Sequence, residues 1–276
     1  HPSDVLTDAI PVHNDRLLTI YEHDVKHILQ LRDLRSGQLI ENLELPGIGC
    51  ITSCQGRRED SFFFFKFTSF LTPGQCFVVD LSGSRLAPEI LVETEVPSFN
   101  PSLYKTEQVF YFSKDGTKIP MFIVSRASQD TCLPKPCVLY GYGGFNISIL
   151  PSFSLSWVLW LQHFDGVVAI ANIRGGGEYG EDWHSAGIID KRQNVYDDFQ
   201  AAAKYLADSN ITQPSKLCIM GGSNGGTLVG ACINQAPELF GAAIAKVGVM
   251  DMCRFHKFTV GSAWISDFGD PENPDH

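Results

Sequence analysis

The feature that most constrains this chain is a serine flanked by glycines, between a strand pattern and a helix pattern. The three segments follow one another as KLCIM (216–220), GGSNGG (221–226) and TLVGACINQ (227–235). A sharp strand-to-helix turn leaves no space for side chains beside its apex, which accounts for Gly221 and Gly225 and lifts the Ser223 hydroxyl above the sheet. The helix N-terminus favours negative charge developing there. The context favours Ser223 as a nucleophile over the alternative, a plain glycine turn with a helix-capping serine.

From residue 106 onward, apolar strand patterns alternate with helix patterns. We expect a hairpin (106–113 and 118–124), strands at 136–142, 167–173, 216–220 and 242–250, and helices at 153–163, 195–209 and 227–235. Continuous apolar strands between helices are typical of a parallel sheet covered on both faces. Asn194 is expected to cap the helix at 195–209. The sequence therefore predicts an α/β class, with the serine turn inside the sheet.

The first 97 residues follow another pattern, of short strands separated by turns. LRDLRSGQL (31–39) and VVDLSGSRL (78–86) match at a spacing of 47 residues, close to the ~40–50 residues of a β-propeller blade. About two such units are present, whereas a closed propeller needs ~4–8 blades, so an ordinary antiparallel sheet is the alternative. With His1 rather than Met in first place, we expect the chain to begin within a propeller.

Two further glycine stretches are candidate binding loops. GGGEYG (175–180) matches the G-x-G-x-x-G pattern, but no strong helix pattern opens directly after it, and Asp197 and Asp198, about 20 residues on, fall inside a helix pattern. Dinucleotide binding is therefore disfavoured, and no cofactor is expected. YGYGGF (140–145) ends an earlier strand of the expected sheet. In hydrolases whose nucleophilic serine lies on a strand-to-helix turn, a loop at this place supplies an oxyanion donor. Tyr142 could give its hydroxyl and Asn224 its backbone N–H, the alternative for Tyr142 being a packing role.

Composition limits the partners and the compartment. The net charge is −10 and the isoelectric point about 5.2, which argues against nucleic acid or an anionic membrane as partner. The longest apolar region, 147–164, contains Pro151, four serines and polar residues, and fails as a membrane span. Eight cysteines form no CxxC pair and no zinc spacing, so we expect no metal and reduced thiols in a cytoplasmic protein. They lie at 50, 54, 76, 132, 137, 218, 232 and 253.

The chain resembles the prolyl oligopeptidase family of serine peptidases over nearly its whole length. The resemblance is carried, in order, by SKDGTKIPMFIV, YGYGGFNIS, ANIRGGGEYGEDWH, GGSNGG and VGVMDMCRFHKFTVGSAW, between residues 113 and 264. It implies an incomplete α/β-hydrolase fold, with its C-terminal part missing, preceded by the last blades of a β-propeller. The implied domains are a partial propeller at 1–97 and the N-terminal portion of a catalytic domain at 98–276.

The resemblance also implies an activity and its residues. A member of the family would cleave short peptides after proline through an acyl-enzyme on Ser223, with Tyr142 and the Asn224 N–H as the oxyanion hole. The proline pocket would comprise Phe145, Val249, Trp264 and Phe268, with Trp264 stacked on the proline ring. The family usually has tyrosine where this chain has Phe268, which leaves the polarity of the pocket open.

The triad is the main departure from the family. Its aspartate and histidine lie further along than residue 276, so we expect an internal piece that is inactive as this chain alone. Asp251 and His256 are candidate substitutes for the triad aspartate and histidine, but the resemblance implies that their segment is structural. The other downstream histidine, His276, is the last residue of the sequence. Two alternatives stay open. One is another serine hydrolase, such as an esterase or exopeptidase, and the other is a truncated isoform or pseudo-enzyme that acts by binding.

Overall fold

The computed structural model describes residues 4–83, 85–128 and 133–274. The chain divides into two compact units, one formed by His1–Pro101 with Leu150–Val158 and the other by Ser102–Ile149 with Leu159–His276. The domain boundary expected at residues 97 and 98 stays a prediction. Each unit is described by itself.

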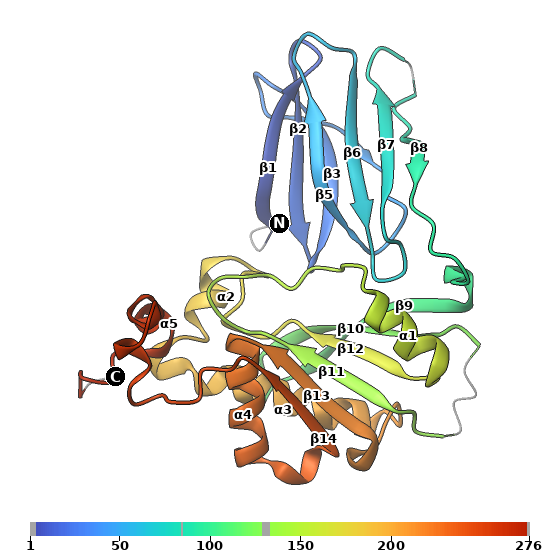
Figure 1. Ribbon diagram of the computed structural model, residues 1–276. Helices are drawn as coiled ribbons and strands as arrows, with labels where there is room; N and C mark the ends of the chain where they lie inside the picture. Colours follow the sequence, from blue (N-terminus) through green and yellow to red (C-terminus); the bar gives the residue numbers. More distant parts are fainter. Residues whose placement is uncertain (1–3, 84, 129–132, 275–276) are drawn as a thin grey trace. The chain divides into compact units, whose positions relative to one another are not determined.

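The first unit contains two four-stranded antiparallel sheets, each built from consecutive strands (Figure 1). One sheet holds β1 (Val5–Val12), β2 (Arg16–His23), β3 (Lys26–Asp33) and β4 (Leu39–Leu43), and the other holds β5 (Cys50–Gly56), β6 (Phe62–Thr68), β7 (Gln75–Asp80) and β8 (Glu89–Glu93). The repeat found in the sequence falls on the turn between the third and fourth strand of each sheet. There Asp33 accepts hydrogen bonds from the N–H and hydroxyl of Ser36, and Asp80 accepts the same pair from Ser82.

Alternation along β6 explains how these sheets form a core. In FFFFKF, Phe63, Phe65 and Phe67 are buried while Phe62 and Phe64 are exposed, as the period of two in a strand requires. The Phe65 ring stacks on Phe77 of β7, with centroids 4.9 Å apart. Buried residues of both sheets join one hydrophobic cluster, so the two repeats share a core.

The second unit is built on a six-stranded mixed sheet. Its order is β14-β13-β11-β12-β10-β9, in which β11 to β14 run parallel while β10 pairs antiparallel with both β12 and β9. The bounds are β9 (Tyr104–Phe112), β10 (Lys118–Arg126), β11 (Cys137–Gly141), β12 (Val167–Ala171), β13 (Leu217–Gly222) and β14 (Ala242–Lys246). The hairpin expected at 106–124 is therefore part of the sheet, and the predicted α/β class is confirmed.

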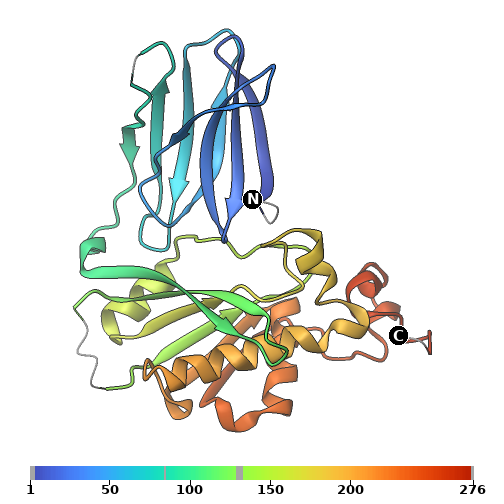
Figure 2. The ribbon, with the colours of Figure 1, turned by 180° about the vertical axis from the view of Figure 1, so that it is seen from behind.

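Helices follow the parallel strands. They are α1 (Leu155–His163), α2 (Glu181–Ser185), α3 (Gln193–Asp208), α4 (Asn224–Gln235) and α5 (Ile265–Phe268), with 3₁₀ turns at Pro101–Leu103, Ile189–Lys191, Pro214–Lys216, Pro237–Leu239, Phe255–Lys257 and Gly261–Trp264. α3 crosses one face of the sheet (Figure 2) and α4 packs against it, and both bury apolar residues in the core of the unit. The predicted cap was wrong: α3 begins at Gln193, and the Asn194 amide inside it donates to the Ala186 carbonyl.

The cysteines in the described part of the chain are free thiols, and Cys132 lies outside that part. Burial raises the pKa of Cys50 to about 11 and that of Cys54 and Cys232 to about 12. These thiols therefore resist ionisation and act as small apolar residues. Across the described residues, no helix combines the length and the apolar character needed to cross a membrane.

Candidate active site

Ser223 occupies the apex of the turn between β13 and α4. Its backbone has φ 54° and ψ −118°, a conformation that a non-glycine residue rarely adopts and that costs ~1–3 kcal/mol. The Ser223 carbonyl accepts the N–H groups of Gly226 and Thr227 at 2.9 and 3.2 Å, which starts the helix. The side chain is exposed. A strained, exposed serine at a strand-to-helix turn is the geometry of a nucleophile elbow.

The glycines beside the serine are required by close backbone contacts. A Cβ atom on Gly221 would lie 2.2 Å from the Gly225 carbonyl oxygen, and one on Gly225 would lie 2.6 Å from the Gly141 carbonyl oxygen. Gly222 differs, because a Cβ there meets nothing nearer than 3.9 Å. The sequence argument for glycine at 221 and 225 therefore has a steric basis in this structure.

Tyr142 is brought to Ser223 by the sheet. β11 and β13 are parallel neighbours, so the residue after β11 and the turn after β13 lie at the same edge. The half-buried Tyr142 side chain interacts with Ser223. Burial raises the pKa of Tyr142 above its ordinary value, and the interaction with Ser223 opposes that rise only in part. The hydroxyl therefore stays protonated near neutral pH and is available as a donor.

Asn224 is the first residue of α4 and is 1% exposed. Its side-chain nitrogen donates to the Tyr142 carbonyl at 2.6 Å, while its Oδ1 accepts from the Arg192 guanidinium. One donor and one acceptor thus fix the amide orientation. The side chain ties the strand end that carries Tyr142 to the helix that carries Ser223.

Three of the four residues predicted for the proline pocket belong to one aromatic cluster. The Phe145 and Phe268 rings meet edge-on with centroids 5.8 Å apart, and Phe255 contacts both Phe268 at 5.4 Å and Trp264 at 6.5 Å. Phe255, which sequence reasoning missed, is therefore the link to Trp264. The backbone of the fourth residue, Val249, is held by the Thr227 hydroxyl, which donates to the Val249 carbonyl and accepts from the Val249 N–H at 3.0 Å each.

Asp251 and His256 have partners other than Ser223. The Asp251 carboxylate accepts the Arg254 guanidinium at 2.6 and 2.8 Å, and His256 Nε2 lies 3.3 Å from the Glu272 carboxylate. These pairings favour the structural interpretation of the segment. His276 lies outside the described residues.

The second glycine stretch packs against backbone. A Cβ atom on Gly175 would lie 2.6 Å from the Gly143 carbonyl oxygen, and one on Gly177 would lie 2.6 Å from the Asn146 carbonyl oxygen. The acidic residue about 20 positions on, Asp198, accepts the Arg174 guanidinium in a buried ion pair at 2.7 Å. The glycines of the apparent dinucleotide motif are thus required by contact with the loop after β11, and its acidic residue is held in an ion pair.

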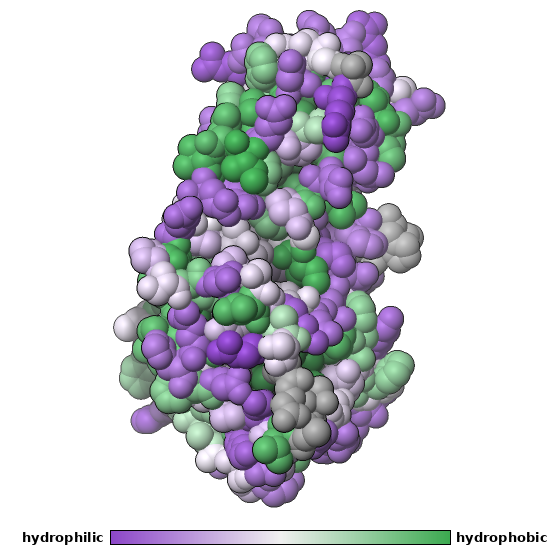
Figure 3. Space-filling model, turned by 90° about the vertical axis from the view of Figure 1, so that its right-hand side faces the viewer, coloured by the Kyte–Doolittle hydropathy of each residue, from purple (hydrophilic) through white to green (hydrophobic). Residues whose placement is uncertain are grey.

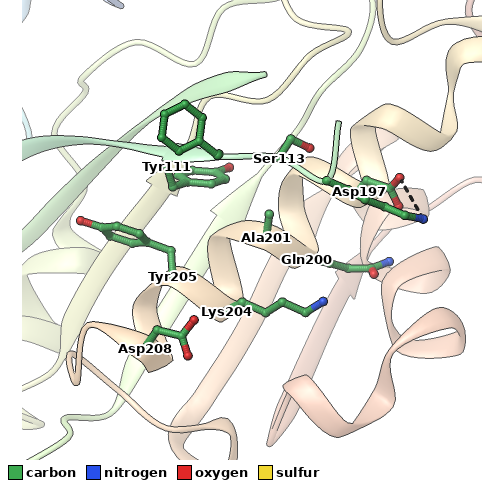
Figure 4. Close-up of a pocket in the computed structure, with 10 residues that line it drawn as sticks. Tyr111, Ser113, Asp197, Gln200, Ala201, Lys204, Tyr205 and Asp208 are labelled. Atoms are coloured by element: carbon green, nitrogen blue, oxygen red, sulfur yellow. Dashed lines mark ion pairs between the residues drawn. The ribbon is translucent and has the colours of Figure 1, made fainter. Parts of the chain in front are cut away.

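A separate pocket of about 340 Å³ lies between the end of β9 and α3 (Figure 4). Tyr111 and Tyr205 line one part of it, and Lys114 pairs with Asp197 at 3.8 Å on its rim. None of the residues lining this pocket belongs to the cluster around Ser223. The candidate chemistry is therefore concentrated at the β13–α4 turn.

Comparisons with known proteins match both parts of the chain. The family model described as "Prolyl oligopeptidase, N-terminal beta-propeller domain" matches residues 1–89, and that described as "Prolyl oligopeptidase family" matches residues 151–276. A prolyl oligopeptidase of Omphalotus olearius is 41% identical over 276 residues, and a prolyl endopeptidase of Dictyostelium discoideum is 43% identical over 263 residues. They cover 99% and 95% of this chain.

A solved structure agrees with these relatives. Prolyl oligopeptidase B from Galerina marginata, bound to a 25mer macrocyclization substrate, matches 100% of this chain with a TM-score of 0.93 at 38% identity. The chain spans 37% and 34% of the length of the two relatives and 38% of that structure. The matches confirm the predicted fold class, propeller strands followed by the start of an α/β-hydrolase domain.

Proposed function

Because the chain belongs to the prolyl oligopeptidase family, we propose that it forms part of a serine peptidase that cleaves short peptides after proline. The observation that carries the proposal is the contact between Ser223 and Tyr142. A serine on a strained turn interacts with the side chain of a tyrosine at the end of the neighbouring strand. Such a pair supplies a nucleophile and an oxyanion donor in one place.

In the proposed reaction, Ser223 Oγ attacks the carbonyl carbon of the substrate proline and gives its proton to a base. The oxyanion formed accepts hydrogen bonds from the Tyr142 hydroxyl and the Asn224 N–H. Collapse of this intermediate breaks the C–N bond, and the amine leaves with the proton that the base had taken. Water, deprotonated by the same base, then attacks the acyl-enzyme, which releases the peptide acid and restores the Ser223 hydroxyl. Because the negative charge exists only after attack, the two donors act on kcat more than on substrate binding.

The aromatic cluster is the proposed proline pocket. Trp264 supplies a flat face for the ring, while Phe145 and Phe268 supply the walls. Val249 remains a proposed lining residue. The Arg192 guanidinium carbon lies 4.8 Å from the Phe268 ring centroid, so a cation covers a ring that lacks the hydroxyl usual in the family.

We also propose that this chain by itself turns over peptides poorly. Asp251 and His256 hold Arg254 and Glu272, so neither is proposed as the base for Ser223. In subtilisin, loss of triad members lowers kcat by ~10⁴–10⁶. A fluorophosphonate probe is therefore expected to label Ser223 slowly in this chain, and rapid stoichiometric labelling would point back to Asp251 and His256.

The test of the function compares variants of the protein that contains this chain. Ser223→Ala is expected to abolish proline-dependent hydrolysis. Trp264→Ala is expected to lower the ratio of kcat/KM for proline and alanine peptides by roughly 10–200-fold, the range for one pocket contact. Phe112→Ala is the matched control, because this aromatic residue is 70% exposed on β9.

Two other functions predict different results. Another serine hydrolase, such as an esterase or exopeptidase, would show Ser223-dependent hydrolysis with no preference for proline. A non-catalytic protein would bind proline-containing peptides while Ser223 stayed unreactive in every assay. An unchanged ratio in Trp264→Ala would exclude the proposed pocket while leaving a serine hydrolase possible.

A further inference from the structure

Two oppositely charged side chains, Arg192 and Asp267, are buried side by side in the second unit. Their side chains are 8% and 3% exposed, and Arg192 Nη1 lies 3.7 Å from Asp267 Oδ1. Arg192 precedes α3, and Asp267 lies in the short helix α5, so they are distant in sequence. A buried ion pair is often no more stable than apolar residues of the same volume. The contacts that Arg192 and Asp267 make with other residues therefore indicate what a charged pair does at this position.

Asp267 holds the backbone of a residue proposed for the proline pocket. Its Oδ1 accepts the Phe145 N–H at 2.7 Å, and its Oδ2 lies 3.4 Å from His184 Nε2. Phe145 has φ 55°, in the left-handed region that a phenylalanine rarely adopts. A charge-assisted hydrogen bond at that residue offsets the strain and holds the backbone that carries the ring.

Arg192 contacts both halves of the candidate site. Its Nη2 donates to Asn224 Oδ1, and the Asn224 amide donates onward to the Tyr142 carbonyl. The carbon of the same guanidinium lies over the Phe268 ring, 4.8 Å from its centroid. One cation thus contacts both the amide that holds the Tyr142 backbone and a wall of the proposed pocket, and the ammonium of lysine lacks the planar array of donors that does this.

We propose that the Arg192–Asp267 pair is a positioning unit that sets the oxyanion hole and the proline pocket together. The proposal rests on the proposed function for its catalytic consequence. The two residues act through Tyr142, Phe145, Asn224 and Phe268 rather than by touching substrate. The expected consequence is that one substitution lowers both turnover and the preference for proline.

The catalytic test uses the protein that contains this chain. Arg192→Lys is expected to lower kcat roughly 10–100-fold, the effect of displacing catalytic groups by about 1 Å, and to lower the proline-to-alanine ratio of kcat/KM several-fold. The matched control is Arg254→Lys, because Arg254 also pairs with an aspartate and lies over a ring, that of Phe258, but is 67% exposed. It is expected to leave kcat and the ratio unchanged.

A second readout needs no substrate. Hydrogen exchange at the Phe145 amide is expected to be much faster in Asp267→Ala than in the unsubstituted protein, because the amide loses its carboxylate acceptor. Asp267→Asn keeps an acceptor oxygen of the same shape, so it is expected to restore slow exchange while kcat stays low through loss of the charge facing Arg192. Arg254→Lys is again expected to have no effect.

The outcomes separate this inference from the proposed function. If the unsubstituted protein shows no proline-dependent turnover but Phe145 exchange follows the expected order, the positioning role stands and the proposed function fails. If the protein is active and Arg192→Lys matches Arg254→Lys in kcat and in the substrate ratio, the inference is overturned. Unchanged Phe145 exchange in Asp267→Ala overturns it as well.

Discussion

The Ser223 N–H donates to the Lys246 carbonyl oxygen at 2.9 Å, which joins the apex of the β13–α4 turn to the last residue of β14. A residue at a strand-to-helix turn leaves the hydrogen bonding of its own strand and has not yet entered that of the helix. The neighbouring strand supplies the missing bond and helps hold Ser223 at φ 54°. The geometry of the proposed nucleophile therefore depends on the sheet around it.

Two adjacent glycines test the steric basis of this turn. Gly221→Ala is expected to lower the free energy of unfolding by roughly 1–3 kcal/mol, because its Cβ must displace the Gly225 backbone. Gly222→Ala is the control, with open space around its Cβ, and is expected to stay within about 1 kcal/mol of the unsubstituted protein. Urea denaturation measures both, and equal losses would contradict the steric account.

Removal of one hydroxyl tests the oxyanion role of Tyr142. Tyr142→Phe is expected to lower kcat roughly 100–1,000-fold, as loss of one oxyanion donor does elsewhere, with little change in KM. Tyr205→Phe, at the separate pocket between β9 and α3, removes the same group and serves as control. A rise in KM at constant kcat would instead assign Tyr142 to substrate binding.

The strained strand-to-helix turn that carries Ser223 could be predicted because its determinants are contiguous in the sequence. The strand, the glycines and the helix around Ser223 lie within 20 residues (216–235). By contrast, Arg192 and Asp267 meet only through the packing of α5 against the 3₁₀ turn Ile189–Lys191, and neither has a local pattern that marks it. The pocket residues rested on resemblance alone, since edge-on contact between Phe145 and Phe268 has no signature in sequence spacing.

The elements that the sequence predicts wrongly, or does not predict, also have physical explanations. β1 and β5 have no strand pattern in the sequence, because apolar and polar residues do not alternate regularly in VLTDAIPV and CITSCQG. The strand expected at 242–250 ends at Lys246, where its carbonyl turns to Ser223. Asn194 has the chemistry of a cap, but tertiary contact with Ala186 determines its position instead.

Glu178 is expected to make the free energy of unfolding fall as pH rises. The side chain is buried, its Oε2 has no partner within the described structure, and burial raises its pKa from 4.5 to about 7. Between pH 4.5 and about 7, Glu178 is protonated in the folded protein and ionised in the unfolded chain. The free energy of unfolding therefore falls as pH rises through this range. Glu178→Gln is expected to add up to about 3 kcal/mol of stability at pH 8 and little at pH 4. A gain that does not change with pH would contradict this.

Asp115 is expected to have the opposite effect, so that the free energy of unfolding falls as pH is lowered. Its hydrogen bond from the Arg174 guanidinium lowers the pKa of the carboxyl from 3.8 to about 2. The stabilisation is present above pH 4 and is lost as pH falls through the folded pKa near 2. The stability difference between the unsubstituted protein and Asp115→Asn is therefore expected to shrink between pH 4 and 2 in urea titrations. A constant difference would assign the effect to packing.

β8, one of the two outer strands of the second four-stranded sheet, is expected to make copies of the isolated chain associate with one another. All of β8 is exposed, including Ile90, Leu91 and Val92 at 54–61%, and apolar surface is visible on this unit in the view from that side (Figure 3). Open apolar strand edges promote pairing between chains. Leu91→Lys is expected to reduce the associated fraction in sedimentation velocity, while Gln213→Lys, which adds the same charge at an exposed position outside the strands, is not. A monodisperse chain without either change would contradict the prediction.

The most direct test of the central claim is to map the covalent adduct of a phosphonate ester that carries proline next to the reactive phosphorus. In the protein that contains this chain, mass spectrometry is expected to find one adduct, on Ser223, formed many times faster than with the alanine analogue, and slowed by Trp264→Ala. An adduct on another residue, or equal rates for the proline and alanine reagents, would contradict the assignment of Ser223 as the nucleophile of a proline-specific peptidase.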